Sequence, residues 1–259
     1  MKSDGKVIVV ANFKGGIGKT TSATAIASVL TEKGYKVLLI DSDPQCNSTD
    51  TYRAKSKDTA TLYDVILDYD DPLPISDAIQ RTESGDIVAS DPALIEGDTK
   101  FERDGNEYFR LKDALDDLSG YDYVIIDTAP TNNIILKNCL VASDYVLIPI
   151  TADRYSIQGL SGLNKAIIDQ QRRNNPALKI AGLLLIKYKQ EQILAKEVHA
   201  ALTDIAIQMR TKVFQTTIRE SVSVQKAQSA RMPLIKYDKN CNAAKDYYLF
   251  VEELLEDIK

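Results

Sequence analysis

The chain has 259 residues, of which 44% are hydrophobic, so it can cover both faces of a sizeable sheet within one domain. It has no apolar run near the roughly 20 residues that a membrane-spanning helix needs, and its three cysteines are too scattered to predict a disulfide framework or a zinc site. A net charge of -5 argues against a protein that coats nucleic acid over its whole surface, although it leaves room for a local basic patch. The short polar start predicts no secretory signal, and we therefore expect a cytoplasmic protein.

Apolar runs alternate with helical patterns over the first two thirds of the chain. Strand, helix, strand units of this kind imply parallel strands joined by right-handed crossovers. Because the strands are apolar throughout, the sheet should be covered on both faces. The predicted elements are, in chain order, a strand at 7–12, a helix at 19–33, a strand at 37–40, a strand at 123–126, a helix at 132–141, a strand at 145–150, a helix at 157–172 and a strand at 180–186.

Two further regions are read from weaker patterns. Residues 51–109 carry acidic turns and no clear period, so we expect a peripheral elaboration there rather than a second domain. The C-terminal third predicts a helix at 191–206, a short strand at Val213, a helix at 221–229 and a last helix at 243–258. We expect the single histidine, His199, to be structural. Residues 1–259 are thus predicted to form one α/β domain with a doubly wound, mostly parallel sheet and helices on both faces.

The turn after the first predicted strand has the residues of a phosphate-binding loop. The GxxxxGK[ST] pattern is not met, because Phe13 stands where its first glycine would be. Nevertheless, three glycines let backbone N–H groups face phosphate oxygens, Lys19 can reach the β- and γ-phosphates, and the Thr20 hydroxyl can bind magnesium at a helix N-terminus. A glycine-rich turn without function is the alternative, but it would not need two lysines and two threonines. The predicted ATP-binding loop consists of Lys14, Gly15, Gly16, Ile17, Gly18, Lys19, Thr20 and Thr21.

Lys14 makes this loop unusual, because a second ammonium group beside Lys19 is repulsive unless a polyanion lies nearby. The segment KGGIGKTT resembles the deviant Walker A motif of P-loop NTPases of the ParA and MinD superfamily. The resemblance implies that Lys14 reaches across a homodimer to the nucleotide of the other subunit. ATP would then hold a sandwich dimer together. The alternative for Lys14 is a solvated surface lysine.

Two acidic segments follow predicted strands, which places them at the carboxyl edge of the sheet beside the loop. The segment DSDPQ, which begins at Asp41, is similar to the DxDPQ element of the family. The resemblance implies that Asp43 orients or deprotonates the attacking water, with Lys14 and Lys19 as the catalytic cations, and that Asp41 supports magnesium through water. Asp127 ends a segment like a Walker B strand and is expected to hold magnesium. As alternatives, Asp43 could form a turn and Asp127 could cap a helix.

Looser similarities extend toward the C-terminus. Lys187 and Pro233 parallel residues that hold the adenine base in the family. The chain ends in an acidic helical pattern, which anionic lipid would repel, so the membrane-binding helix of MinD-like proteins is not expected. An iron–sulfur role is set aside, because the first cysteine after Asp127 is the distant Cys139.

The resemblance to ParA-type partition ATPases implies a function. Slow hydrolysis of ATP would be coupled to dimerisation, the ATP dimer would bind DNA nonspecifically on the nucleoid, and a ParB-like centromere-binding adaptor would stimulate hydrolysis. A plasmid, chromosome or mobile element would thereby be segregated. Glu191 stands where the family has an arginine, so solubility is an alternative role for the remaining basic residues. The candidate DNA contacts are Arg219, Lys226, Arg231 and Lys236.

Two other function classes stay open. The protein could be an ATPase switch that positions or assembles a protein complex without a DNA role, as MinD-like proteins do. It could also be a biosynthetic ligase or kinase that shares the loop, in which case turnover would need a small-molecule acceptor.

Overall fold

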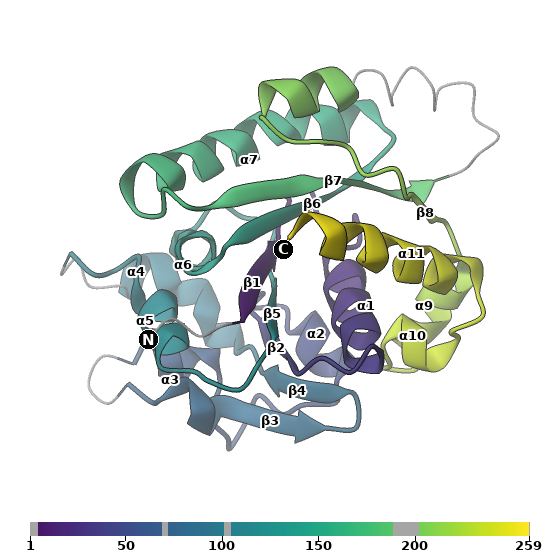
Figure 1. Cartoon of the computed structure of the whole chain (residues 1–259). Helices are drawn as coiled ribbons and strands as arrows, with labels where there is room; N and C mark the ends of the chain where they lie inside the picture. The colour runs from purple at the N-terminus through teal and green to yellow at the C-terminus, as the bar shows by residue number, and fades with distance from the viewer. Residues whose placement is uncertain (1–4, 69–71, 101–104, 189–201, 259) are drawn as a thin grey trace.

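The computed structural model describes residues 5–68, 72–100, 105–188 and 202–258. One eight-stranded sheet runs through the molecule, in the order β3-β4-β2-β5-β1-β6-β7-β8 (Figure 1). Within the described residues β3 runs antiparallel to β4, and every other neighbouring pair is parallel, which confirms the predicted doubly wound sheet. The strands are β1 (Lys6–Val10), β2 (Val37–Asp41), β3 (Ile79–Thr82), β4 (Gly85–Val88), β5 (Tyr123–Asp127), β6 (Tyr145–Thr151), β7 (Lys179–Tyr188) and β8 (Ile218–Arg219).

Helices pack on both faces of the sheet (Figure 1). One face carries α1, α9, α10 and α11, and the other carries α3, α5, α6 and α7. The helices are α1 (Lys19–Glu32), α2 (Asn47–Thr51), α3 (Leu62–Ile66), α4 (Gly97–Lys100), α5 (Arg110–Asp116), α6 (Ile134–Ala142), α7 (Arg154–Arg173), α9 (Val222–Ser229), α10 (Leu234–Tyr237) and α11 (Asn242–Asp257), with the 3-10 helices η1 (Ile75–Ala78) and η2 (Pro92–Glu96).

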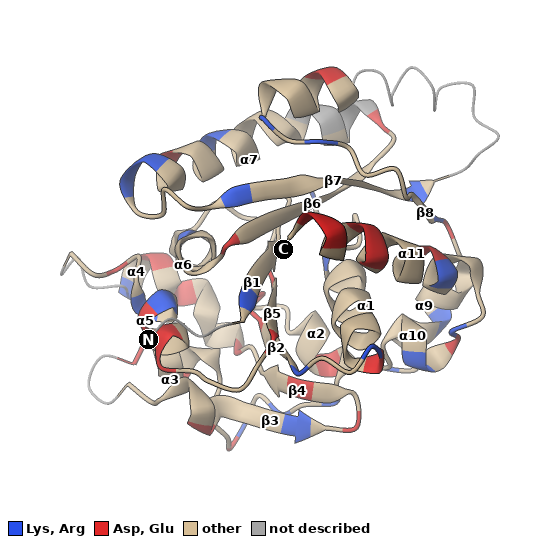
Figure 2. Cartoon of the chain, viewed as in Figure 1, with Lys and Arg blue, Asp and Glu red and all other residues tan. Residues whose placement is uncertain are grey.

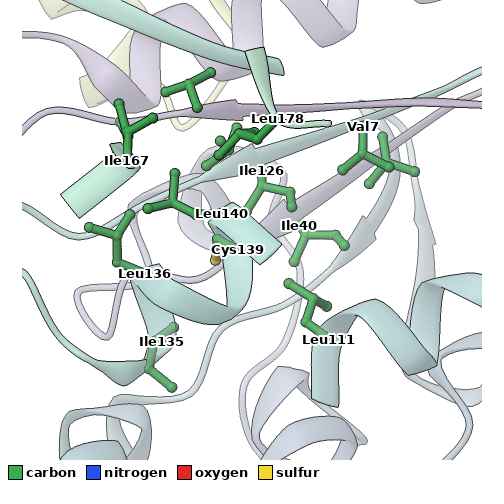
Figure 3. Close-up of a cluster of buried hydrophobic side chains, with 14 of the residues drawn as sticks. Val7, Ile40, Leu111, Ile126, Ile135, Leu136, Cys139, Leu140, Ile167 and Leu178 are labelled. Carbon is green, nitrogen blue, oxygen red and sulfur yellow. The ribbon is translucent and has the colours of Figure 1, made fainter. Parts of the chain in front are cut away.

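Successive side chains of the apolar strands point to opposite faces of the sheet, which divides the core into two clusters. In β1, Val9 points into the cluster under α6 and α7, whereas Val10 points into the cluster under α1 and α11. Figure 3 shows part of the first cluster, where Ile40 and Ile126 from the strands lie beside Cys139 of α6. Each fully buried valine, leucine or isoleucine side chain contributes about 2 kcal/mol to the stability of the fold, so both helix layers are bound firmly to the sheet.

The structure departs from the sequence prediction mainly in residues 51–109. These residues are not only peripheral, because β4 pairs with β2 and β3 extends the sheet to its edge. Each strand has only four residues, and several are polar or glycine, so no apolar run marked them. Residue Val213 makes a single bridge to Leu183, and the strand at that edge is β8 instead.

The predicted helix at 191–206 falls largely outside the described residues, as does His199, while residues 202–208 are helical. The described helices include none that is both long and apolar enough to cross a membrane.

Candidate functional site

A cavity opens at the carboxyl ends of the central strands, between α1, α2 and α9. The strand register explains why the predicted groups meet there. Asp41 at the end of β2 is paired with Asp127 at the end of β5, and Asp127 is in turn paired with Val10, the last residue of β1 before the phosphate loop. The loop and both acidic segments therefore leave the sheet at the same edge, as predicted.

The phosphate loop wraps the N-terminus of α1. Residues 15–21 all line the cavity. Gly16 and Gly18 have φ values of 69° and 102°, in the left-handed region that favours glycine, and a Cβ on Gly18 would come within 3.1 Å of the Ile186 side chain. The loop thus presents backbone N–H groups and the positive end of α1 to the cavity, an arrangement that suits phosphate oxygens.

Lys19 lies inside this loop and is almost fully buried, with 6% of its surface exposed. Its Nζ donates to the Lys14 carbonyl at 3.3 Å. Burial lowers the pKa of Lys19, whereas the charges of Asp127 and Asp43 oppose that shift. A triphosphate beside Lys19 would stabilise its ammonium form further, which suits the role predicted for it.

Lys14 is the one residue of 14–21 that does not line the cavity. Its Nζ donates to both carboxylate oxygens of Asp153, at 2.9 and 2.8 Å, and to Ser156 Oγ at 2.9 Å. Burial works to raise the pKa of Asp153, but hydrogen bonds from Lys14, Thr151 and Ser156 hold it well below its ordinary value. Within one chain Lys14 is therefore bound to the N-terminus of α7, and its predicted position in a dimer stays a prediction.

Asp127 is fully buried, and only one of its two carboxylate oxygens has a hydrogen-bond partner. Its Oδ2 accepts from Ser48 Oγ at 2.8 Å, whereas its Oδ1 has no hydrogen-bond partner. A buried acceptor without a partner is costly unless a ligand uses it. Magnesium is commonly bound by one or two carboxylates together with phosphate oxygens, so Asp127 Oδ1 and the nearby Thr20 hydroxyl fit that ion.

Asp41 lies behind the cavity wall and supports α2. Its Oδ2 accepts from the backbone N–H of Thr49 at 2.7 Å and from its Oγ1 at 2.8 Å, and its Oδ1 accepts from the Asp43 N–H at 3.2 Å. Burial, followed by the charge of Asp127, raises the pKa of Asp41 to about 7. Asp41 does not line the cavity, so the water-mediated support predicted for it would act from behind.

Asp43 lines the same cavity as the phosphate loop. Its Oδ1 accepts from the Gln45 N–H at 3.0 Å, and its carbonyl accepts from Ser90 Oγ at 2.7 Å. These bonds fix the turn that carries it, while its carboxylate stays at the cavity wall, where it can orient a water molecule. The catalytic role of Asp43 stays a prediction.

The two predicted base contacts lie in different places relative to the cavity. Lys187 lines the cavity and its Nζ donates to the Gly16 carbonyl at 2.7 Å, so it braces the phosphate loop. Pro233 is buried at the start of α10 and does not line the cavity, so its contact with the base stays a prediction. The wall is instead formed by residues that sequence reasoning missed, among them Val224 and Gln228 of α9 and Tyr247 of α11. They had no recognisable motif, because α9 is a short polar helix whose place at the cavity depends on tertiary packing.

Three of the four candidate DNA contacts have partners within the chain. Arg219 forms an ion pair with the buried Asp246, with Nη2 at 2.6 Å from Oδ1. Arg231 is paired with Asp50, and Lys236 donates to the Glu83 carbonyl. The fourth, Lys226, is exposed on α9.

We predict that Asp127→Asn stabilises the nucleotide-free protein and removes the magnesium dependence of nucleotide binding. Burial raises the pKa of Asp127 from 3.8 to about 6. Its contribution to stability is therefore fully present below about pH 3.8 and lost progressively as the pH rises from there to about 6, whereas asparagine does not titrate. The variant should exceed the wild type by about 3 kcal/mol in free energy of unfolding at pH 8 and by only about 1 kcal/mol at pH 4.5. Urea unfolding at the two pH values measures this, and an equal difference at both would contradict the assignment.

Comparison with known proteins agrees with this geometry. Residues 5–180 match the AAA domain family. The chromosome partitioning protein ParA of Caulobacter vibrioides is 32% identical over 96% of this chain and 94% of its own. Among solved structures, a cobyrinic acid a,c-diamide synthase of Mycobacterium smegmatis is 29% identical with a TM-score of 0.81 over 97% of this chain and 94% of its own. A plasmid partition protein of Borrelia burgdorferi is 28% identical, with a TM-score of 0.75, and the match covers 98% of this chain and 99% of its own. By its relation to the Caulobacter protein along nearly its whole length, the chain belongs to the ParA family of partitioning ATPases.

Proposed function

We propose that the protein is a magnesium-dependent ATPase that dimerises on ATP and partitions a plasmid, chromosome or mobile element. The observation that carries the proposal is the conjunction of the phosphate loop, the partnerless oxygen of Asp127 and the carboxylate of Asp43 at one cavity. Related structures support the ligand: the Mycobacterium smegmatis synthase was solved with ADP and magnesium, and a Borrelia burgdorferi partition protein with AMPPNP.

The residues of the cavity divide the work of phosphoryl transfer. Backbone N–H groups of the loop and the ammonium group of Lys19 bind the β- and γ-phosphates and neutralise charge as the terminal phosphate leaves. Asp43 orients a water molecule for attack and accepts its proton. Thr20 and Asp127 would hold magnesium, which supplies further charge neutralisation between the phosphates.

Dimerisation would depend on Lys14. We infer that Lys14 leaves Asp153 and binds the nucleotide of the partner subunit, so that ATP becomes part of the interface. In the ATP state the dimer binds DNA nonspecifically at the nucleoid, and a ParB-like centromere-binding adaptor stimulates hydrolysis and releases it. The names of two relatives, a chromosome partitioning protein and a chromosome-partitioning ATPase, support the partitioning part of this role.

Two other activities compete with this proposal. A switch that assembles a protein complex would hydrolyse ATP without DNA binding. The similarity to a diamide synthase favours a third candidate, a biosynthetic ligase or kinase that needs a small-molecule acceptor. Such an enzyme would turn over only when the acceptor is present, whereas the proposed ATPase hydrolyses ATP with water alone.

We predict that the protein is retained on unrelated duplex DNA with ATP and magnesium and released by salt. Neutralisation of several phosphates makes such binding fall steeply with ionic strength. Anisotropy of a labelled duplex at 50 and 200 mM salt, roughly the range over which phosphate contacts lose most of their effect, measures it. Lys19→Ala is the control, because it removes a contact with the phosphates of ATP and should therefore prevent the ATP-dependent retention on DNA. Hydrolysis without DNA retention at the lower salt would favour the assembly switch.

A further inference from the structure

Two helices that line the nucleotide cavity end on an arginine in a backbone conformation typical of glycine. Arg53 follows α2 with φ 55°, and Arg231 follows α9 with φ 53°. In both, the backbone closes back on the last helical turn: the Arg53 N–H donates to the Asp50 carbonyl and the Arg231 N–H to the Gln228 carbonyl, each at 3.0 Å. Helices commonly end this way on glycine, because a side chain disfavours this backbone conformation.

The two arginines also exchange contacts across the gap between the helix ends. Arg53 Nη2 donates to the Ala230 carbonyl beside Arg231 at 3.2 Å, and Arg231 Nε lies 2.7 Å from Asp50 Oδ1 in α2. We call this reciprocal pair, Arg53 and Arg231, the arginine clasp. The ion pair is more than half exposed, at 52% and 56%, and pairs of that kind add little stability. The exposed ion pair therefore does little to offset the cost of the two backbone conformations.

The clasp forms one wall of a hollow beside the nucleotide cavity. This basic hollow carries five exposed cationic side chains and one carboxylate, that of Glu83 on the β3–β4 turn. Figure 2 shows basic residues at the tip of β3 and over α9 and α10. In a chain with a net charge of -5, five cations around one opening are a local excess. The cations of the basic hollow are Arg53, Lys55, Arg81, Arg231 and Lys236.

We propose that the basic hollow binds the phosphate backbone of duplex DNA, with the arginine clasp as its central contact. The proposal rests on the DNA-binding function proposed above and gives it a location. Arginine and lysine clusters recognise phosphates through charge and hydrogen bonds. An interface with a protein would instead need apolar or aromatic anchors, but Tyr52 in the lining is buried and Met232 is half-buried.

The same contacts connect this surface to the nucleotide cavity. Asp50, the partner of Arg231, also lines the nucleotide cavity, and α2 continues from the turn that carries Asp43. A DNA phosphate that binds Arg231 competes with Asp50 for the guanidinium group. Nucleotide bound at Asp43 would contact the turn before α2, and DNA bound at Arg231 would change the contacts of Asp50 near the C-terminal end of that helix.

The test uses variants that remove charge without straining the backbone. Arg53→Gly with Arg231→Gly removes two cations at positions where glycine is favoured, so folding should be preserved and the melting temperature equal or higher. Arg172→Gln with Arg173→Gln removes the same charge at the end of α7 and is the matched control. Asp50→Asn frees Arg231 while keeping every cation. Each full-length protein is titrated with a labelled 40-base-pair duplex of unrelated sequence at saturating ATP and magnesium, at several salt concentrations.

For the Arg53→Gly, Arg231→Gly protein we expect affinity for DNA to fall roughly tenfold and the slope of log affinity against log salt to decrease by about 2. The control should keep the wild-type slope, and Asp50→Asn should bind DNA more tightly.

If the wild type binds DNA and the glycine variant binds equally well, the location is wrong while the proposed function stands. If the wild type hydrolyses ATP and binds no DNA, both fail. Tighter binding of polyglutamate than of DNA to the wild type, lost in the glycine variant, would assign the surface to an acidic protein and overturn the proposal.

Discussion

Replacing Asp43 by alanine is expected to lower ATP hydrolysis by about 10²–10⁴-fold, the usual contribution of a group that accepts a proton from the attacking nucleophile. ATP should stay bound, because the loop, Lys19 and the magnesium ligands Thr20 and Asp127 are untouched. The dimer that ATP holds together would then persist instead of dissociating after turnover. Light scattering with ATP should show a dimer that outlasts the wild-type dimer many times over, and phosphate release should measure the lost rate.

The turn that carries Asp43 does not depend on its whole side chain, which makes the experiment interpretable. Ser90 binds the carbonyl of Asp43 and Asp41 binds its N–H, so the backbone keeps two of its anchors after substitution. Asp43→Asn should behave like the alanine variant, since an amide orients water without taking its proton. Asp204→Ala removes an exposed carboxylate away from the cavity and serves as the charge-matched control. Unchanged hydrolysis in Asp43→Ala would assign proton acceptance to another group.

Most of the site could be predicted from the sequence, because its main parts lie at the ends of apolar strands. Asp41 and Asp127 each stand at the end of a buried strand. A parallel sheet therefore brings them to one edge beside the loop after β1, irrespective of how the helices pack. The glycines of the loop carry their own conformational signal, and Gly16 and Gly18 take the positive φ values that glycine permits.

The remainder depends on contacts that no local pattern encodes. The strands β3 and β4 are four residues each and polar, so only their pairing with β2 identifies them as strands. Sequence alone gives Lys14 a charge but not the carboxylate of Asp153, which lies 139 residues away. Likewise, Arg53 and Arg231 stand where a helix end would favour glycine, and nothing in either segment marks those positions as left-handed.

Lys14 is held by its own chain in this structure, so a dimer in which it binds the partner's nucleotide must first break that contact. Its ion pair with Asp153 is about one third exposed on each side and is worth no more than about 1 kcal/mol. A triphosphate offers a stronger anion than one carboxylate, so the exchange is favourable once ATP is bound. The contact with Asp153 should therefore weaken the dimer without preventing its formation.

Two substitutions at this contact are expected to change dimerisation in opposite directions. Lys14→Ala should abolish the ATP dimer, because the cation that crosses the interface is gone, while ATP binding by the monomer persists through Lys19. Asp153→Asn should keep α7 intact, since asparagine caps a helix as well as aspartate does, but it releases Lys14 and should tighten the dimer by about fivefold for each lysine freed. Analytical ultracentrifugation with ATP and magnesium distinguishes the outcomes. A dimer of wild-type affinity in Lys14→Ala would show that Lys14 belongs to the surface of its own subunit, bound to Asp153 and nothing else.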